Sequence, residues 1–307
     1  MTEKCVRVKV PATSANLGPG FDSLGMALGL YSEFSLTLRE SPGLSFDLRG
    51  MGAENIVADE HNIVWQAIKY LLERAGEQNK YRGAHIGLVN KIPLSRGMGS
   101  SATAIVGGLK AANAFLGDPY GKRDLVQMAT NLEGHPDNVA PAVLGGVTVS
   151  IMERGRVQSL SFWPKIRLQM VLAVPDFQLP TRLARQALPD NVPLKDAIFN
   201  IGHASLLVAA LCRGNEACLR HAFADTLHQP YRAHLIPGLT EVIHAAKKAG
   251  ALGASLSGAG PSVIAFTAER SRIAPRVAAA MQQNFAAQGV TAKTLILPLD
   301  TKGAQVI

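Results

Sequence analysis

The stretch Lys91-Ile-Pro-Leu-Ser-Arg-Gly-Met-Gly-Ser-Ser-Ala-Thr-Ala104 combines two glycines, two serines and the start of an apolar segment. Gly97 and Gly99 allow the backbone to turn sharply and to approach a ligand closely. Ser100 is placed to cap a helix whose apolar positions recur at helical spacing. These positions are Ala102, Ile105, Val106, Leu109, Ala112 and Leu116. Because a helix N-terminus presents free N–H groups and a partial positive charge, the stretch indicates a cradle for a phosphate group.

The same stretch has alternative interpretations. Gly97-Met-Gly-Ser-Ser-Ala102 matches the glycine pattern of dinucleotide-binding folds. Those folds need an acidic residue at the end of a second strand about 20 positions on. Asp118 instead lies in a turn predicted between two helices. No Walker loop is present, because GxxxxGK followed by Ser or Thr does not occur. By its own pattern, the stretch fits a structural turn as well as a phosphate site.

Composition limits the class of protein. With 307 residues, 47% hydrophobic and 18% charged, the chain is typical of a soluble globular protein of two domains. Its continuous apolar runs are too short for a bilayer, which needs about 20 residues, and no signal peptide is visible. The three cysteines show no CxxC spacing, which argues against a disulfide scaffold or a zinc site. We expect a cytoplasmic protein that is not bound to a membrane.

The net charge of +8 raises nucleic-acid binding as an alternative function. The basic residues are scattered and aromatic residues make up only 6%, so the sequence contains no stacking platform or arginine-rich tract. Attraction of small anionic ligands explains the charge better, and we expect no nucleic-acid partner.

Strand and helix patterns alternate without the regular repeat of a doubly wound sheet, which favours an α+β fold. Valines alternate with charged residues over Val6–Val10, which predicts a strand that ends at Pro11. A charged turn at 153–156 precedes a new apolar strand, and the part beyond it contains two strand-helix-strand units. We therefore predict domains over residues 1–160 and 161–307.

Three separated segments resemble the motifs of the GHMP kinases, small-molecule kinases named for galactose, homoserine, mevalonate and phosphomevalonate. The segments are Pro11-Ala-Thr-Ser-Ala-Asn-Leu-Gly-Pro-Gly-Phe-Asp-Ser-Leu-Gly25, the loop Pro93 to Ala102, and Gly253-Ala-Ser-Leu-Ser-Gly-Ala-Gly-Pro261. The first lacks the lysine or arginine near its start, and the Gly-Glu-His near its end, that sugar and mevalonate members are expected to carry. It resembles the members that act on homoserine. So do Glu133-Gly-His-Pro-Asp-Asn-Val-Ala-Pro-Ala142, Thr181-Arg-Leu-Ala-Arg185 and Tyr231-Arg232.

The resemblance runs from Val6 to about Gly303 and implies both fold and function. It implies a two-domain α+β fold with a ribosomal-protein-S5-like α/β domain for ATP over 1–160 and a ferredoxin-like α+β domain over 161–307. It also implies ATP-dependent phosphorylation of L-homoserine to O-phospho-L-homoserine in threonine biosynthesis, by a homodimer that uses ATP and Mg²⁺.

The resemblance assigns the nucleotide site to the second motif and one following helix. The residues that wrap the ATP phosphates are Pro93, Leu94, Ser95, Arg96, Gly97, Met98, Gly99, Ser100, Ser101 and Ala102. Ser101 and Glu133 occupy the positions of the family's magnesium ligands. Mg²⁺ takes hard oxygen ligands, commonly one or two from the protein with phosphates and water completing the set. Without the motifs, Ser101 would read as a helix cap and Glu133 as a surface carboxylate.

Homoserine carries an ammonium group, a carboxylate and a hydroxyl, so its site needs an acid, a guanidinium and polar groups. By resemblance, Arg185 and Arg232 bind the carboxylate, since the planar fork of arginine can hold both oxygens. Asp22 with Asn16 is the candidate ammonium site. His135, Asp137, Asn138 and Thr181 complete the substrate pocket. We expect Asp137, Asn138 and Arg185 to be catalytic, while a general base, either Asp22 or Asp137, is left open.

Two further alternatives stay open at this point. One is a sibling kinase of the family that acts on another small alcohol. The other is a catalytically inactive relative that binds a ligand or a partner, although the loop glycines, both serines and Glu133 are intact.

Overall fold

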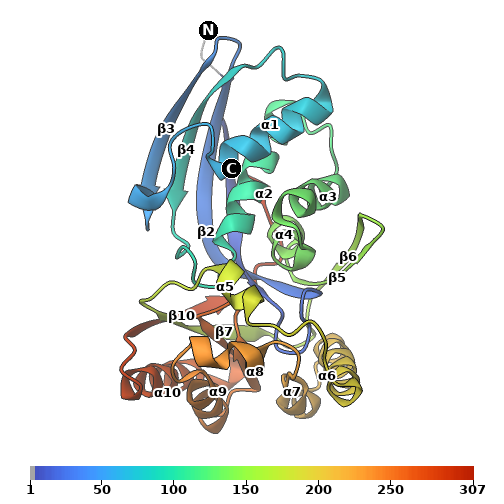
Figure 1. Ribbon diagram of the computed structural model, residues 1–307, viewed down its shortest axis with the longest axis vertical. Coiled ribbons are helices and arrows are strands. Elements are labelled where there is room, and N and C mark those ends of the chain that lie inside the picture. The colour runs from blue at the N-terminus through green and yellow to red at the C-terminus, as the bar shows by residue number, and fades with distance from the viewer. Residues whose placement is uncertain (1–3) are drawn as a thin grey trace.

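Two β-sheets, one above the other in Figure 1, organise the molecule. The structure is a computed structural model that describes residues 4–307. Within this range the upper sheet has seven strands, with a main path β11-β1-β2-β4-β3 to which β5 and β6 are added beside β2. The β3–β4 pair is parallel and the others are antiparallel. The strands are β1 (Val6–Ala15), β2 (Leu24–Arg39), β3 (Gly43–Gly50), β4 (Gly83–Asn90), β5 (Val147–Glu153), β6 (Arg156–Phe162) and β11 (Gln305–Val306).

Four helices cover one face of the upper sheet (Figure 1). Val8 and Val10 of β1 are fully buried and belong to the same apolar core as Ile105 and Leu109. The alternation of β1 thus places its valines against the helix that follows the glycine loop. The helices are α1 (Ile63–Ala75), α2 (Ser100–Phe115), α3 (Lys122–Glu133) and α4 (Pro136–Leu144).

The expectation that Pro11 ends the first strand is wrong. Strand β1 continues to Ala15, and its pairing with β2 shifts register between Pro11 and Ala12. Proline lacks an N–H group, and a bulge is a place in a sheet where that loss is tolerated. The continuation matters because it carries the chain from the sheet to the loop that follows Ala15.

The lower sheet has the strand order β10-β7-β9-β8, and its neighbouring strands are antiparallel. Helices α9 (Leu239–Lys248) and α10 (Ala274–Ala287) pack on one face. The succession β7, α9, β8, β9, α10, β10 is the βαββαβ arrangement of ferredoxin-like domains. The strands are β7 (Leu168–Pro175), β8 (Gly253–Leu256), β9 (Val263–Ala268) and β10 (Ala292–Pro298).

A continuous apolar cluster joins the two halves. Leu17 and Met26 from the upper half share it with Leu172 and Phe266 of the lower sheet. The mixed α+β architecture is therefore confirmed, and the halves meet through buried side chains. The limits 1–160 and 161–307 stay a prediction, and the last strand, β11, pairs with β1 of the upper sheet.

The remaining helices lie beside or between the two sheets. They are α5 (Thr181–Gln186), α6 (Leu194–Arg213), α7 (Glu216–Ala222) and α8 (Gln229–Arg232), with short 3-10 turns η1 (Ala53–Asn55), η2 (Ala233–Leu235) and η3 (Glu269–Ser271). Helix α5 lies at the level where the halves meet (Figure 1).

Helix α6 differs from the expectation that every apolar segment is too short for a bilayer. In the described part of the chain it is the one helix long and apolar enough to cross a membrane, with 20 residues and a mean hydropathy of 1.3. Its charged residues lie near its two ends, and uncharged polar residues interrupt the part between them. Counting only uninterrupted apolar runs therefore underestimated the length of this apolar helix. One such helix is weak evidence for a membrane span.

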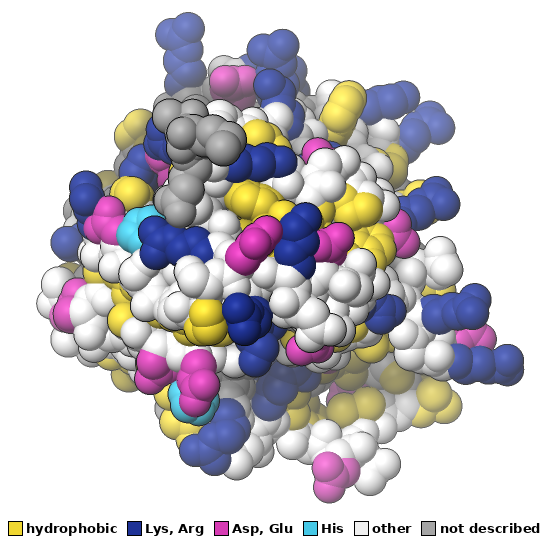
Figure 2. Space-filling view, turned by 90° about the horizontal axis from the view of Figure 1, so that it is seen from above, with side chains coloured by type: hydrophobic (Ala, Val, Ile, Leu, Met, Phe, Trp, Pro, Cys, Tyr) yellow, Lys and Arg dark blue, Asp and Glu magenta, His cyan; other side chains and the backbone are white. Residues whose placement is uncertain are grey.

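Basic side chains are dispersed over the face of the molecule that Figure 2 presents. There they alternate with acidic, apolar and uncharged groups. Among the described residues on that face, they form no single stripe of the kind that follows a nucleic-acid backbone.

Candidate active site

A polar cavity of about 120 Å³ lies where the two halves meet. It is bounded by the loop after β1, the glycine loop before α2, the junction of α3 and α4, and helices α5 and α8. The predicted site residues that line it are Asn16, Asp22, Ser95, Arg96, Gly97, Gly99, Ser100, Ser101, Glu133, His135, Asp137, Asn138, Thr181, Arg185 and Arg232. Segments far apart in the sequence therefore converge on one small space.

The glycine loop has a left-handed backbone at two positions that also leave no room for a side chain. Gly97 and Gly99 have φ angles of 71° and 67°. A Cβ atom on Gly97 would overlap the carbonyl oxygen of Ser257, and one on Gly99 would overlap the hydroxyl of Thr13. Ser257 also donates a hydrogen bond of 2.6 Å to the carbonyl of Gly97. The glycines thus allow the loop to be held between β1 and the loop after β8.

The expectation that Ser100 caps the following helix is wrong. Ser100 is the first residue of α2, and the cap position is occupied by Gly99, which makes no side-chain capping bond. The left-handed conformation of Gly99 starts the helix one residue earlier than the sequence suggested. Both hydroxyls and the first amides of a 16-residue helix consequently face the cavity side without a capping side chain, which suits an anion.

Ser101 and Glu133 meet at the end of α3. The Ser101 hydroxyl donates to Oε2 of Glu133 at 2.9 Å. Burial raises the pKa of Glu133, although the hydrogen bond from Ser101 opposes the shift. Within residues 4–307 no group of three or more His, Cys, Asp or Glu side chains could hold a metal ion. The Ser101 hydroxyl and the Glu133 carboxylate are nevertheless two adjacent hard oxygen donors. They fit a Mg²⁺ ion whose other ligands are phosphate oxygens and water.

The junction of α3 and α4 supplies the next group. Nδ1 of His135 donates to Oδ1 of Asp137 at 2.6 Å, and Asp137 lies buried in the first turn of α4. Burial alone would lower the pKa of His135, but the hydrogen bond and charge of Asp137 outweigh it and raise the pKa. Thr13 donates to Oδ1 of Asn138 at 2.8 Å. That bond orients the amide of Asn138, which lines the cavity.

Asp22 and Arg185 form a two-pronged ion pair on a second part of the cavity wall. Nη1 and Nη2 of Arg185 donate to Oδ2 and Oδ1 of Asp22 at 3.1 and 2.8 Å. Burial would lower the pKa of Arg185, but its hydrogen bond and attraction to Asp22 raise it. The backbone N–H of Asp22 donates to Oδ1 of Asn16, whose Nδ2 donates to the carbonyl of Gly258. The loop after β1 is thereby fixed to the lower half.

Arg232 is almost completely buried, with 2% of its surface exposed. Its Nε donates to the carbonyl of Ala184 at 3.0 Å and its Nη1 to that of Gly258 at 3.3 Å. Burial, reinforced by the charge of Arg185, lowers the pKa of Arg232 to about 10. The group is still a cation at neutral pH, and it is held by neutral carbonyls.

Two residues that contact Arg185 or Arg232 were missed by the sequence interpretation. The ring of Phe21 lies 5.8 Å from the guanidinium carbon of Arg185 and 5.3 Å from that of Arg232, within the range of cation–π contacts. The position of Phe21 next to Asp22 was the only available signal. His228 is the second of these residues. Its Nε2 donates to the carbonyl of Gly18 at 2.8 Å and its Nδ1 lies 3.3 Å from Nη1 of Arg232.

Only some of the loop residues that were predicted to wrap the phosphates line the cavity. Arg96 lines the cavity and donates through Nη2 to the carbonyl of Asp176, while its buried Nη1 has no partner among the described residues. Pro93, Leu94, Met98 and Ala102 are not lining residues. Met98 and Ala102 are buried in the apolar core, so their place in the motif is structural in this fold.

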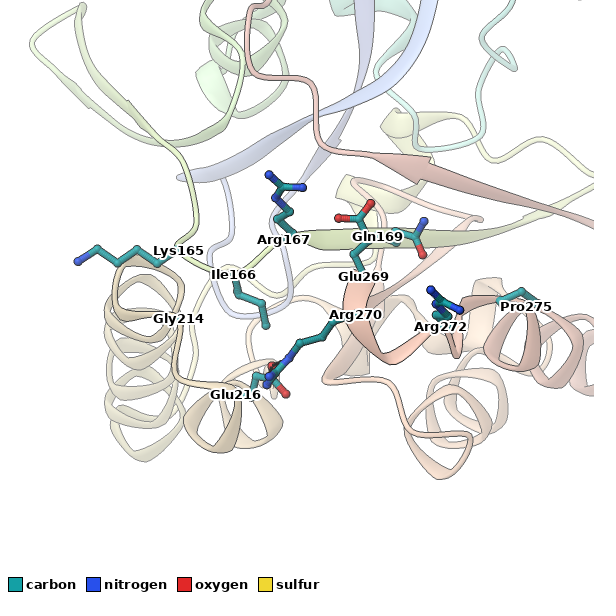
Figure 3. Close-up of a pocket in the computed structure, with 10 residues that line it drawn as sticks. All are labelled: Lys165, Ile166, Arg167, Gln169, Gly214, Glu216, Glu269, Arg270, Arg272 and Pro275. Carbon is teal, nitrogen blue, oxygen red and sulfur yellow. Dashed lines mark hydrogen bonds and ion pairs between the residues drawn. The ribbon is translucent and has the colours of Figure 1, made fainter.

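A larger hollow of about 940 Å³ lies elsewhere, at the start of β7 and around η3 (Figure 3). Its cations do not converge. Arg270 turns to Glu216, at 2.6 Å, and Lys165 points away from the other labelled side chains. Because a site for a small ligand needs groups that point to a common centre, the smaller cavity between the halves is the better candidate.

Comparison with known proteins shows the family to which the chain is similar. The family described as GHMP kinases N terminal domain matches residues 62–146, and the family described as GHMP kinases C terminal matches residues 207–287. A protein of Carboxydothermus hydrogenoformans named homoserine kinase is 48% identical over 97% of this chain and 96% of its own length. A homoserine kinase of Desulfitobacterium hafniense is 43% identical over 98% of this chain and 100% of its own length.

Solved structures give the same picture. The crystal structure of homoserine kinase from Cytophaga hutchinsonii superposes with a TM-score of 0.90 and 31% identity, covering 100% of this chain and 98% of its own. A mevalonate kinase of L. major in complex with R-mevalonate has a TM-score of 0.72 at 18% identity, covering 96% of this chain and 95% of its own. The second likeness concerns the fold alone.

Proposed function

Because the chain belongs to the GHMP kinase family, in the branch formed by the homoserine kinases, we propose that it transfers the γ-phosphoryl group of ATP to the hydroxyl of L-homoserine. The products are ADP and O-phospho-L-homoserine, an intermediate of threonine biosynthesis. The observation that carries the proposal is the cavity, which brings a glycine loop that suits phosphate together with Asp22, Arg185 and Arg232.

The phosphates bind along the glycine loop. The first amides of α2 and the hydroxyls of Ser100 and Ser101 bind their oxygens, and Arg96 adds a positive charge. Ser101 and Glu133 would hold Mg²⁺, which would neutralise charge on the phosphates. A cavity of about 120 Å³ is much smaller than the roughly 300 Å³ or more of most ligand pockets, so the nucleoside extends beyond it.

The second part of the cavity wall binds the amino acid by its two charges. Arg185 and Arg232 bind the carboxylate, and Asp22 with Asn16 binds the ammonium group. The two charged groups, which share one carbon, are then held by these residues, and the hydroxyl at the other end of the substrate is directed to the phosphate loop. His135 and Thr181 close the space between the walls.

Transfer depends on position and charge more than on covalent chemistry, because the transition state of phosphoryl transfer is loose. Asn138 is oriented by Thr13 to donate from Nδ2 into the cavity, where the hydroxyl and the phosphoryl oxygens meet. Asp137 accepts from His135 and holds this imidazole in one orientation. With Arg185, these residues carry the catalytic role that we assign.

The cellular setting follows from the same proposal. We assign the enzyme to the cytoplasm as a homodimer without nucleic-acid or membrane partners, with an ATP domain over 1–160 and a second domain over 161–307. Sedimentation of the purified chain measures the dimer directly. Binding to DNA at low salt measures the effect of the +8 charge, and its presence would contradict this part of the proposal.

The test is ADP release by the purified chain with homoserine, mevalonate, galactose and shikimate, with the product identified by ³¹P NMR. We expect kcat/KM for homoserine to exceed the others by about 100-fold or more, because the paired charges of the site would be left unmatched by the other alcohols. A preference for any other alcohol overturns the proposal. Glu133→Gln in the same assay should raise the Mg²⁺ concentration needed for half-maximal rate, whereas the surface variant Glu153→Gln should not.

A further inference from the structure

Asp22 and Arg185, the residues assigned to opposite charges of the substrate, are bound to each other in the structure. The pair is two-pronged, at 3.1 and 2.8 Å, and both side chains are about one-third exposed, at 36% and 37%. Both line the cavity. A ligand that binds Asp22 or Arg185 therefore has to break the ion pair between them.

The geometry around the pair fixes what a ligand must offer. Asp22 has a φ angle of 54° and its backbone is held by Asn16. The Arg185 guanidinium lies near the ring of Phe21, which also faces Arg232. Arg232 has no ion-pair partner within residues 4–307 and lines the same cavity, so it adds one more positive charge beside the pair.

A ligand with only one charge would leave one member of this ion pair without a counter-charge. A carboxylate alone would draw Arg185 from Asp22 and leave an acid uncompensated in a partly buried site. An amine alone would leave Arg185 uncompensated next to Arg232. An α-amino acid supplies both charges on one carbon, so it replaces one ion pair by two.

We infer that the Asp22–Arg185 pair is a charge filter: it admits a zwitterionic alcohol by exchange of ion pairs and disfavours alcohols that carry only an anion or only a cation. The inference rests on the proposed function and extends it from the binding of homoserine to the rejection of related alcohols. In this inference Asp22 has two effects: it binds the ammonium group of homoserine, and it weakens the binding of monoanions because it competes with them for Arg185.

The decisive variant is Asp22→Asn, tested with 4-hydroxybutanoate, which is homoserine without its amine. Asparagine tolerates the left-handed conformation of position 22, so the loop is preserved. We expect homoserine to bind more weakly to the variant and 4-hydroxybutanoate to bind more tightly, by about three- to fivefold, as an exposed bidentate pair suggests. Affinities are measured by calorimetry with a non-hydrolysable ATP analogue present, and thermal melting checks the fold.

Two controls separate the filter from general electrostatics. Asp118→Asn removes an acid that is also left-handed, with a φ angle of 59°, and that also pairs with a cation, Lys110, at 2.8 Å, but outside the cavity. It should change neither affinity. The affinity of Asp22→Asn for the ATP analogue should stay within about twofold, because a general gain in positive potential would favour the more highly charged nucleotide most.

The reciprocal variant is Arg185→Gln, tested with 3-aminopropan-1-ol, which is homoserine without its carboxylate. We expect its affinity to increase, because Asp22 is released. In the double variant, the gain of Asp22→Asn for 4-hydroxybutanoate should disappear, since Arg185 is the group that it frees.

The outcomes are distinct. If the wild-type chain phosphorylates homoserine but Asp22→Asn binds 4-hydroxybutanoate no better, the filter is refuted and the proposed function stands. A parallel gain for the ATP analogue also refutes the filter. If the wild-type chain does not phosphorylate homoserine, both proposals fall together.

Discussion

The glycine loop and the wall formed by Phe21, Asp22, Arg185 and Arg232 line the same cavity, yet they handle charge by different means. The loop relies on backbone amides and hydroxyls, and its shape is fixed by close contacts with Thr13 and Ser257. The wall relies on charged side chains, held by one another, by carbonyls and by an aromatic ring.

The difference teaches where each wall is sensitive. A loop built from backbone recognises any suitably placed anion and tolerates no added side-chain atom. A wall built from paired side chains distinguishes one ligand from another and tolerates changes that preserve charge and reach. Substitutions in the loop should therefore affect the whole reaction, and those in the wall should affect the choice of alcohol.

The largest effect is expected for Gly97→Ala. The added Cβ overlaps the backbone carbonyl of Ser257, which cannot move away as a flexible side chain could. We expect kcat/KM to fall by about 100-fold and the free energy of unfolding by about 2 to 4 kcal/mol. ADP release and urea unfolding measure both.

Gly76→Ala is the matched control, because Gly76 has a similar φ angle of 72° but nothing within 4 Å of the added atom. It should lose about 1 to 2 kcal/mol of stability through backbone strain and keep its activity. Equal losses of activity in both variants would mean that backbone strain, and not the close approach of the two halves, governs the loop.

Arg232→Lys should have the next largest effect. Lysine keeps the charge but cannot reach the Ala184 carbonyl, the Gly258 carbonyl and a carboxylate together. We expect KM for homoserine to rise by about 30-fold, which corresponds to about 2 kcal/mol, with KM for ATP almost unchanged. Steady-state kinetics with each substrate varied measure the split. Arg270→Lys, at an exposed pair with Glu216, is the control, and an equal rise in both KM values would refute the division between the walls.

A smaller effect is expected at His228, which positions Arg232. Burial lowers the pKa of His228, so the ring is neutral, with Nε2–H donating to Gly18 and Nδ1 accepting from Arg232. Asparagine retains an acceptor near Nδ1, and glutamine retains a donor near Nε2. We expect KM for homoserine to rise by about threefold in His228→Asn and about tenfold in His228→Gln, with kcat unchanged. A larger increase in KM for His228→Asn than for His228→Gln would mean that the contact with Gly18 matters more than the contact with Arg232.

The smallest effect is a pH dependence of stability at the bottom of the cavity. The pKa of His135 is above its ordinary value of 6.5, so its protonated form stabilises the fold below that pH. The contribution is lost as pH rises through the folded-state pKa. The free energy of unfolding should thus differ between wild type and His135→Gln by about 1 kcal/mol more at pH 6 than at pH 8.5. Asp137→Asn should lower the pKa of His135, as NMR titration measures; an unchanged pKa would contradict the pairing.

The sequence supported the prediction of the fold class because its signals are local. Alternating valines predicted β1, and apolar spacing predicted the buried side of α2, most of which lies in the core. The family was predicted from separated motifs, and the homologues confirm it. Pro11 was misread because a bulge depends on the partner strand, and the cap at Ser100 because a left-handed Gly99 starts the helix earlier.

The site was predicted as a set of residue names without their mutual contacts. The cavity gathers most of the residues that the motifs supplied, and their individual roles stay predictions. Phe21 could not be found from spacing, because Arg185 and Arg232 are 164 and 211 positions away in the chain and become its neighbours only when the two halves pack. His228 lies one helical turn before Arg232, but its contact with Gly18, 210 positions away, depends on the same packing. For the same reason the mutual pairing of Asp22 and Arg185, 163 positions apart, was not foreseen.

The pairing of β11 with β1 has a consequence for the order of events during synthesis. Val306 and Gln305 pair with Val8 and Lys9, so one edge of the upper sheet is completed by residues that follow the whole lower sheet in the chain. That edge of β1 has no partner strand until β11 has been made. A variant truncated before Gln305 would keep the other strands of both sheets but leave this edge of β1 unpaired, and an exposed strand edge of this kind favours aggregation.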